Sequence, residues 1–240
     1  MCGEGLRYPT PLEKTVHCEP GVVASVEWPL TIPNTPLVAE VVLETKHGNH
    51  LTKKTGYLNA TPGVWEIARL TDIPMTLGQR LRGQDEAPYD HAATAALIDV
   101  SEDKLAGKRL NSIFMHPPYK GGVGYCFAKF DVNLPEGKPM LEFALGFREG
   151  SSTQDGCVFS VLVIESDKEN EVFKEQYATL GAWAERSVDL SPYAGKAVTL
   201  KLVTDVGPAD NSSSDWALWG APRIVMNNVM KVEILDKRPQ

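Results

Sequence analysis

Short apolar runs, separated by glycine and proline, recur along the whole chain. Val198–Thr204 alternates apolar and polar residues, which is typical of a strand with one wet face. Val158–Ile164 is more continuously apolar, as in a central strand. The pattern predicts strands at Gly21–Glu27, Leu37–Thr45, Gly63–Thr71, Ala96–Val100, Leu110–Met115, Tyr125–Asn133, Met140–Phe147, Cys157–Glu165, Glu171–Ala178, Ala184–Leu190, Ala197–Thr204, Ala217–Val225 and Lys231–Leu235.

Helical signals are few. Asp90–Leu97 is rich in alanine and is the best candidate helix. Ser191–Gly195 predicts a single turn, with Ser191 as N-cap and Pro192 at the first helical position. Leu77–His91 is polar and loop-like, and it is either an internal boundary or a long loop within one sandwich. We therefore expect an all-β protein, a jelly-roll β-sandwich of two antiparallel sheets.

Strand parity gives this sandwich two ends. Successive antiparallel strands alternate in direction, so every second connection lies at the same end. Counting from Tyr125 places four connections together: His116–Gly124, Arg148–Gly156, Thr179–Trp183 and Asp205–Trp216. Loops on a rigid scaffold are where function usually resides, so we expect the site at this end.

The composition of the chain argues against some classes of partner and location. The 240 residues include 24 basic and 31 acidic side chains, a net charge of -7 that disfavours a nucleic-acid partner. No apolar run is long enough for a transmembrane helix, and no signal peptide is visible, although a mature form would lack one. Cys126 and Cys157 lie in apolar runs and are expected in the core, whereas pairing of Cys2 with Cys18 is left open.

Carboxylates gather in the loop before Trp216. Asp205 and Asp215, with Asp155 from a neighbouring loop, supply the hard oxygen ligands that Ca²⁺ prefers. The alternative is that these side chains bond their own backbone in turns. Two carboxylates are also the catalytic groups of glycoside hydrolases, so this activity is a second alternative. The sequence does not show which of them would be the general acid and which the general base. We assign no catalytic residue and name calcium as the one candidate cofactor.

Aromatic and polar side chains in the same loops suggest a sugar site. Trp183 is the best candidate for stacking on a sugar ring, and the alternative is that it packs in the core. His116 leaves its strand through two prolines that aim it at these loops, and it either bonds a sugar hydroxyl or ties its loop to a backbone carbonyl. Tyr119, Asp210 and Asn211 complete the candidate ligand-binding residues.

A series of motifs in order resembles a known family. They are His116-Pro117-Pro118, Asp155-Gly156-Cys157, Trp183, Val188–Lys196, Asp205 and Asp215-Trp216-Ala217, spread over about residues 110–225. The sequence resembles galactose-binding-like β-sandwich modules, and especially the carbohydrate-binding modules found beside family 98 glycosidases. The resemblance implies a jelly roll, often extracellular and attached to glycoside-degrading enzymes, and sometimes with bound Ca²⁺, in a secreted bacterial system.

We therefore expect one domain over residues 1–240, in which residues 1–109 add strands that complete or cap the sandwich. The expected function is a non-catalytic carbohydrate-binding module, extracellular or on the cell surface, with a periplasmic location also open. Its expected partners are an oligo- or polysaccharide and a catalytic domain of a parent protein, with no nucleic acid and no membrane span. The alternatives are a structural or assembly domain of a larger secreted protein, and a glycoside hydrolase or lyase.

Overall fold

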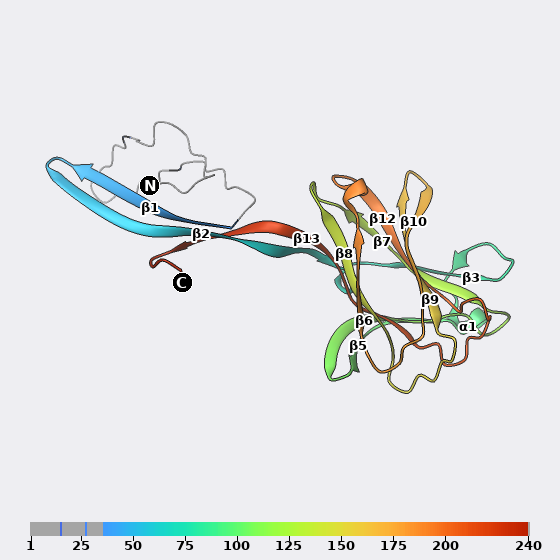
Figure 1. Cartoon of the computed structure of the whole chain (residues 1–240). Helices are drawn as coiled ribbons and strands as arrows, with labels where there is room; N and C mark the ends of the chain where they lie inside the picture. Colours follow the sequence, from blue (N-terminus) through green and yellow to red (C-terminus); the bar gives the residue numbers. More distant parts are fainter. Residues whose placement is uncertain (1–14, 16–26, 28–35, 240) are drawn as a thin grey trace. The chain divides into compact units, whose positions relative to one another are not determined.

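The computed structural model describes residues 15, 27 and 36–239, without the side chains of 227–229. Cys2, Cys18 and all but the last residue of the predicted strand Gly21–Glu27 lie outside the described residues. The described elements are almost all strands (Figure 1). The exceptions are α1 (His91–Thr94) and two 3₁₀ turns, Leu70–Asp72 and Ser191–Tyr193.

The strands match the predicted order closely from β6 onward. They are β1 (Leu37–His47), β2 (His50–Arg69), β3 (Thr76–Leu81), β4 (Ala87–Pro88), β5 (Leu97–Leu105), β6 (Lys108–His116), β7 (Gly124–Asn133), β8 (Pro139–Phe147), β9 (Cys157–Glu165), β10 (Lys168–Tyr177), β11 (Ala184–Asp189), β12 (Ala197–Asp205) and β13 (Ala217–Leu235).

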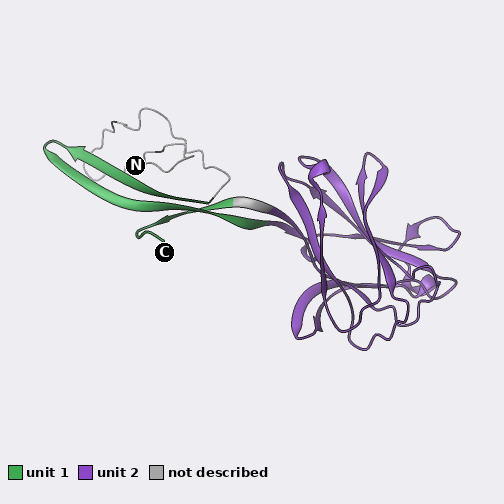
Figure 2. Cartoon of the chain, viewed as in Figure 1, with its two compact units in different colours: residues 1–65, 227–240 green, residues 66–226 purple. Residues whose placement is uncertain are grey.

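The chain divides into two compact units (Figure 2). Unit 1 comprises residues 1–65 and 227–240, and unit 2 comprises residues 66–226. In unit 1, β1 pairs antiparallel with β2 from Leu37↔Ala60 to His47↔His50. Gly48 opens the two-residue turn of this hairpin with φ +59°, a conformation that glycine adopts without steric cost. That residues 1–240 form one domain stays a prediction.

Unit 2 is a jelly roll, and this confirms the predicted fold class. One sheet contains the strand order β6-β13-β8-β11, and β5 pairs with β6 at its edge. The other contains β7-β12-β9-β10, and β3 and β4 extend it beyond β7. All of these pairings are antiparallel. This is the eight-stranded double Greek key, so the chain direction alternates as expected from strand parity.

Aromatic side chains fill the space between the two sheets. Trp219 on β13 is fully buried, and its ring lies 5.0 Å from Phe143 and 5.2 Å from Phe159. Its indole nitrogen donates to the hydroxyl of Thr204 on the facing sheet, at 3.0 Å. The buried polar group is thus satisfied, and the bond joins β13 to β12. Cys126 and Cys157 are buried in this core, as predicted.

The outer face of the β7-β12-β9-β10 sheet holds a buried lysine. Lys201 is 1% exposed and pairs with Glu86 and, at 2.9 Å, with Glu169. Its ammonium also lies 4.6 Å from the ring centre of Phe127. Desolvation of a charge is costly unless it is paired, and the two carboxylates supply the pairing. The face predicted to be wet is therefore covered around this residue.

Several predicted local features were wrong. The predicted strand Gly63–Thr71 covers only the end of the longer β2. β4 and most of β3 lie in the segment Leu77–His91, which was predicted to be a loop. The strands predicted at Ala217–Val225 and Lys231–Leu235 are one continuous strand, β13. Ser191 is the first residue of its turn, and the N-cap is Leu190, which has no side-chain capping bond. The carboxylate of Asp189 accepts from the backbone and hydroxyl groups of Ser191. Asp189 satisfies the turn two residues on, as aspartate commonly does.

Gly156 holds two loops of unit 2 together. Its φ is +71°, and a Cβ added there would meet the carbonyl oxygen of Tyr177 at 2.0 Å. Only glycine lets the 148–156 loop approach the end of β10 so closely. Gly83 has a similar φ of +75°, but a Cβ added to it would meet nothing within 4 Å, so it isolates the cost of the backbone conformation alone.

We expect Gly156→Ala to lower the free energy of unfolding by at least about 2 kcal/mol more than Gly83→Ala. The Gly83 variant bears only the left-handed strain, about 1 kcal/mol, whereas the Gly156 variant must also move backbone. Urea unfolding of both variants measures the difference. Equal losses would show that the close approach contributes nothing to stability.

Candidate functional site at the loop end of the sandwich

The predicted gathering of loops at one end of unit 2 is confirmed. The amide of Arg148 donates to the carbonyl of Trp216 at 2.8 Å, and the hydroxyl of Ser151 donates to the carbonyl of Ser214 at 2.5 Å. The amide of Val206 donates to the carbonyl of Gly124 at 3.1 Å. These bonds join the 116–124, 148–156 and 205–216 connections, while Gly156 brings in the end of β10.

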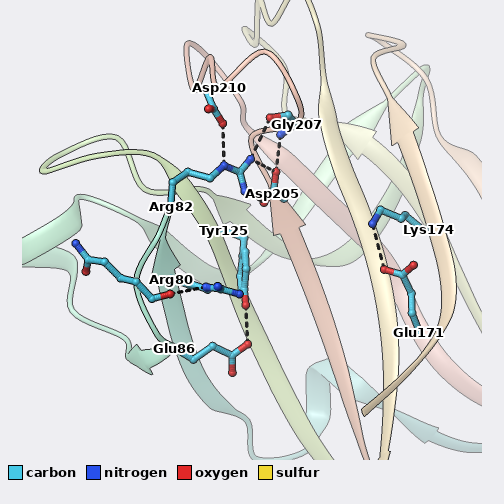
Figure 3. A network of polar contacts seen from close by, with 10 residues as sticks. Arg80, Arg82, Glu86, Tyr125, Glu171, Lys174, Asp205, Gly207 and Asp210 are labelled. Atoms are coloured by element: carbon cyan, nitrogen blue, oxygen red, sulfur yellow. Dashed lines mark hydrogen bonds and ion pairs between the residues drawn. The ribbon is translucent and has the colours of Figure 1, made fainter.

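Asp205 is held by an arginine that the sequence did not point to. Arg82 follows β3 and donates to both carboxylate oxygens of Asp205, at 2.6 and 2.7 Å (Figure 3). Its Nε donates to Asp210 at 2.8 Å, and Nη2 donates to the carbonyl of Gly207 at 3.1 Å. The bond to Asp205 is the chief cause that raises the pKa of Arg82. One guanidinium therefore pairs with both Asp205 and Asp210 and offsets one of their two negative charges.

A second carboxylate site lies beside the first, and we call Asp155 and Asp215 the carboxylate pair. Asp215 is fully buried and accepts from the hydroxyl of Thr153 at 2.7 Å. Asp155 accepts from the side chain of Asn211 at 3.2 Å. The other oxygen of each carboxylate, Oδ2, is buried without a hydrogen-bond partner. Burial first, and then the charge of Asp155, raises the pKa of Asp215 to about 6.

The carboxylate pair fits a calcium ion, and Asp205 does not. Two orphaned carboxylate oxygens are what a cation would satisfy, whereas both oxygens of Asp205 already accept from Arg82. Within the described residues, no group of three or more acidic, histidine or cysteine side chains is placed to hold a metal. Calcium would therefore need carbonyl oxygens and water beside Asp155 and Asp215, and when bound it would offset their repulsion.

His116 and Tyr119 lie together near α1. Their ring centres are 4.9 Å apart. His116 is buried, its Nδ1 is 2.7 Å from the carbonyl oxygen of Pro117, and burial lowers its pKa. Of the two roles considered for His116, the structure shows the contact with its own loop. Tyr119 is 54% exposed, and its amide donates to the carbonyl of Thr94.

Trp183 lies on the outer face of the β6-β13-β8-β11 sheet. A Cβ added to Gly146 or Gly220 would meet the indole ring at 2.9 or 2.6 Å, so the ring rests directly on these two strands. The indole nitrogen donates to the carbonyl of Lys108, the first residue of β6, at 3.0 Å. The side chain is half-buried and packs with Leu105, Phe114 and Leu218. Packing therefore fixes the ring at the surface of the sheet, and its stacking on a sugar stays a prediction.

A pocket of about 400 Å³, the loop-end pocket, lies beside this cluster. Its apolar lining comes from Leu105, Phe147 and Leu180, and its polar lining from Lys104, Arg148 and Glu149. Arg148 stacks 3.9 Å from the ring centre of Phe114 and bonds Asp103 at 2.8 Å, so its position is fixed. Burial alone would raise the pKa of Asp103, but the hydrogen bond from Arg148 outweighs it together with those from Ser112 and Ser101, so the pKa is lowered.

The structure thus spreads the predicted ligand residues over three places. Trp183 adjoins the loop-end pocket, His116 and Tyr119 lie near α1, and Asp210 and Asn211 contact Arg82 and Asp155. Sequence reasoning missed Arg82 and Arg148. It had one usable signal for the position of Trp183, because glycines inside strands, such as Gly146 and Gly220, often mark a close approach of another group.

No protein-family model matches this sequence. An uncharacterised protein of Archaeoglobus fulgidus is 39% identical over 75 residues, which is 29% of this chain and 19% of that protein. The match thus spans less than a fifth of the length of that relative. No helix in the described part of the chain is long and apolar enough to cross a membrane.

Similar solved structures are carbohydrate-binding modules. The family 51 module with INT domains from Clostridium perfringens ZmpB, solved with GlcNAc, has a TM-score of 0.41 and 12% identity, covering 82% of this chain and 39% of that chain. The family 51 module from Clostridium perfringens GH95, solved with methyl-galactose, has a TM-score of 0.32 and 17% identity, covering 69% and 91%.

The raised pKa of Asp215 generates a pH prediction. Because the folded pKa of about 6 lies above the ordinary value of 3.8, the carboxyl adds stability that is fully present below about pH 4. That stability is lost as the pH rises through 6. In EDTA, we expect the wild type to lose on the order of 2–3 kcal/mol from this group between pH 4 and pH 7. Asp215→Asn should not show this loss.

Thermal unfolding of the wild type and of Asp215→Asn across pH 4–8 measures this loss of stability. Asp167→Asn is the matched control, because Asp167 is an exposed carboxylate in the β9–β10 turn with φ +65°, which asparagine tolerates. It should follow the wild type. Parallel curves for wild type and Asp215→Asn would refute a protonated Asp215 in the folded protein.

Proposed function

We propose that this chain is a non-catalytic carbohydrate-binding module that holds a sugar in the loop-end pocket. The observation that supports this most is the pocket itself, about 400 Å³ with an apolar lining and a charged rim. Sugars present apolar C–H faces and hydroxyl edges, and such pockets match both. Leu105, Phe147 and Leu180 suit the faces, and Lys104, Arg148 and Glu149 suit the hydroxyls.

The geometry of the carboxylates favours binding over hydrolysis. A glycosidase needs two carboxylates that flank the scissile bond in a cleft. Asp155 and Asp215 lie close together, and the raised pKa of Asp215 resembles that of a general acid. However, neither lines the loop-end pocket, and Asp215 is fully buried. The alternative of a purely structural domain would leave the pocket without a role.

The wider setting is also a proposal. The relative from Archaeoglobus fulgidus is longer than this chain, since the same match is 29% of this chain and 19% of that protein, and a longer parent protein is consistent with this difference. We infer that the module is extracellular or on the cell surface, where it holds a glycan-degrading catalytic domain near its polysaccharide. The acidic net charge of -7 suits a soluble surface that does not bind nucleic acid. The resemblance to modules beside family 98 glycosidases suggests the kind of parent protein.

The carboxylate pair is the proposed calcium site. We infer that Asp155 and Asp215 hold the ion through their orphaned oxygens and that the ion stiffens the joined loops beside the pocket. Its role is structural, because Asp155 and Asp215 come from the 148–156 and 205–216 connections, which are bonded to each other, and both Oδ2 atoms are buried.

We expect saturating calcium at pH 7 to raise the melting temperature of the wild type by several degrees. A ligand at a hundred times its Kd adds about 2.7 kcal/mol, and each kcal/mol moves a domain of this size by about 2–4 °C. Asp215→Asn should not respond, whereas Asp205→Asn should keep the response because Arg82 occupies Asp205. A wild-type melting curve unchanged between EDTA and calcium would remove the metal.

We expect Leu180→Ala to weaken sugar binding by about three- to tenfold with little change in melting temperature. Leu180 is 43% exposed and lines the loop-end pocket, so it contributes contact area and little stability. Trp183→Ala should instead lower stability by about 2 kcal/mol or more, because the indole fills the space over two glycines. Isothermal titration with methyl-galactoside, GlcNAc and β-1,4-galactotriose measures the affinities, and calorimetry measures stability.

Tyr119→Ala distinguishes the two possible locations at the loop end. Tyr119 is exposed near α1, away from the residues that line the loop-end pocket, so its loss should leave affinity unchanged. If Tyr119→Ala abolishes binding and Leu180→Ala does not, the sugar binds beside His116 and the pocket assignment is wrong. If none of the three sugars binds the wild type, the proposed function itself fails for these ligands.

A further inference from the structure

A second hollow, the sheet-face groove, lies on the outer face of the β6-β13-β8-β11 sheet. Its volume is about 480 Å³, and its lining includes Lys108, Leu110, Glu142, Glu185, Gly220 and Arg223. It shares no lining residue with the loop-end pocket. None of the residues predicted to bind ligand lines it, so it needs an explanation of its own.

Strand register sets the polar groups of the groove in one row. Ser187 on β11 is opposite Glu142 on β8, and Glu142 is opposite Arg223 on β13. Side chains at directly paired positions point to the same face of a sheet. Leu141, the neighbour of Glu142, belongs to the core, so the row faces outward. A hydroxyl, a carboxylate and a guanidinium thus lie side by side across three strands.

A β-bulge puts Arg223 into that row. The register of β13 against β8 shifts between Gly220 and Arg223, and Ala221 there has φ +43°. Without the extra residue, Pro222 would be opposite Glu142 and Arg223 would point into the core. Positive φ in alanine costs about 1–2 kcal/mol. Burial of Ile224, which the bulge returns to the core, offsets part of that cost. The bulge also leaves Arg223 on the outer face of the sheet.

The next row forms the floor. Glu185 is opposite Ala144, and Ala144 is opposite Gly220, so two of these three positions carry almost no side chain. Trp183 and Leu110 close one side, because both would meet a Cβ on Gly220 within 3 Å. Lys108, the first residue of β6, pairs with Glu185 at 2.6 Å, and both side chains are more than half exposed. An exposed ion pair of this kind is weak and opens readily.

The charges of the groove favour a neutral ligand. Arg223 bonds Glu142 at 2.9 Å, Lys108 bonds Glu185, and Arg186 bonds Glu175 at 2.6 Å. Each positive side chain that lines the groove is thus already paired. Among the described residues, the hydroxyl of Ser187 and the Oε1 of Glu142 have no hydrogen-bond partner. An acceptor and a hydroxyl at adjacent positions match two neighbouring hydroxyls of one sugar ring.

The geometry points to the sheet-face groove as a second sugar-binding site, which accepts an uncharged hexose residue through Ser187, Glu142 and Arg223. The choice of a sugar rests on the proposed function, but the groove is independent of the loop-end pocket. The Glu142 carboxylate accepts from one hydroxyl and the Arg223 guanidinium donates to its neighbour. The chain would then engage two residues of a glycan, or two glycans, and gain from effective concentration.

Amide NMR can test both sites in one titration. With β-1,4-galactotriose as the probe, the amides of Gly220 and Ala144 report on the groove, and those of Gly150 and Gly181 report on the loop-end pocket. Gly83, in an open turn, serves as the reference. We expect both pairs of amides to shift with the sugar, each with its own apparent Kd in the millimolar range.

Variants assign the groove contacts. Glu142→Gln should weaken the groove response about tenfold, because a charged acceptor is lost. Glu66→Gln is the matched control, because Glu66 also pairs with Arg223, at 3.5 Å, but does not line the groove. It should behave as wild type. If Glu142→Gln does not fold, Ser187→Ala on the exposed edge strand should still weaken the response about threefold.

The outcomes separate the two proposals. Shifts at Gly150 and Gly181 alone would overturn the second site and leave the proposed function intact. Shifts at Gly220 and Ala144 alone would keep the groove and overturn the loop-end pocket. A groove response unchanged in both Glu142→Gln and Ser187→Ala would overturn the assigned contacts. No shift at either site would overturn both proposals for this sugar.

Discussion

The hydrogen bond between Trp219 and Thr204 is the constraint on which the sandwich of unit 2 depends. It joins one strand of each sheet inside an apolar core, and the ring around it packs against Phe143 and Phe159. Because an unpaired indole nitrogen in this core would be costly, the two sheets are held in one relative register. The strand ends, and therefore the four loops, follow from that register. The carboxylate pair and the loop-end pocket both lie where those loops meet.

The outer face of the β6-β13-β8-β11 sheet is shaped by glycine and alanine positions that have little or no side chain. Gly146 and Gly220 let Trp183 lie directly on the backbone, and Ala144 continues the small surface toward β11. The indole thus separates two hollows, one lined by loop residues and one by strand residues. The loops supply apolar contact and a fixed arginine, and the strands supply a row of polar groups. The two candidate sites therefore have different chemistry on one scaffold.

Sequence reasoning predicted the strands from β6 to β12 within two or three residues, because each is a run of core residues bounded by turn formers. It missed β3, since Gly78 and Arg80 hide the alternation, and Gly78 is small because Phe127 lies against it. The candidate site was only partly predictable. Parity placed the loops, but the arginine that neutralises Asp205 comes from a segment 123 residues away, and no local pattern encodes that contact. The groove depends on a bulge at Ala221, which strand alternation does not reveal.

The packing of Trp183 has a consequence for how this surface can evolve. Any side chain at Gly146 or Gly220 would occupy the position of the indole ring, so neither glycine can mutate while the tryptophan stays. Loss of the tryptophan would free both positions at once and open a hollow that larger residues could fill. In a lineage of such proteins, these three positions should therefore change as a set. The path from one arrangement to the other therefore runs through a form in which the tryptophan is lost and both glycines remain.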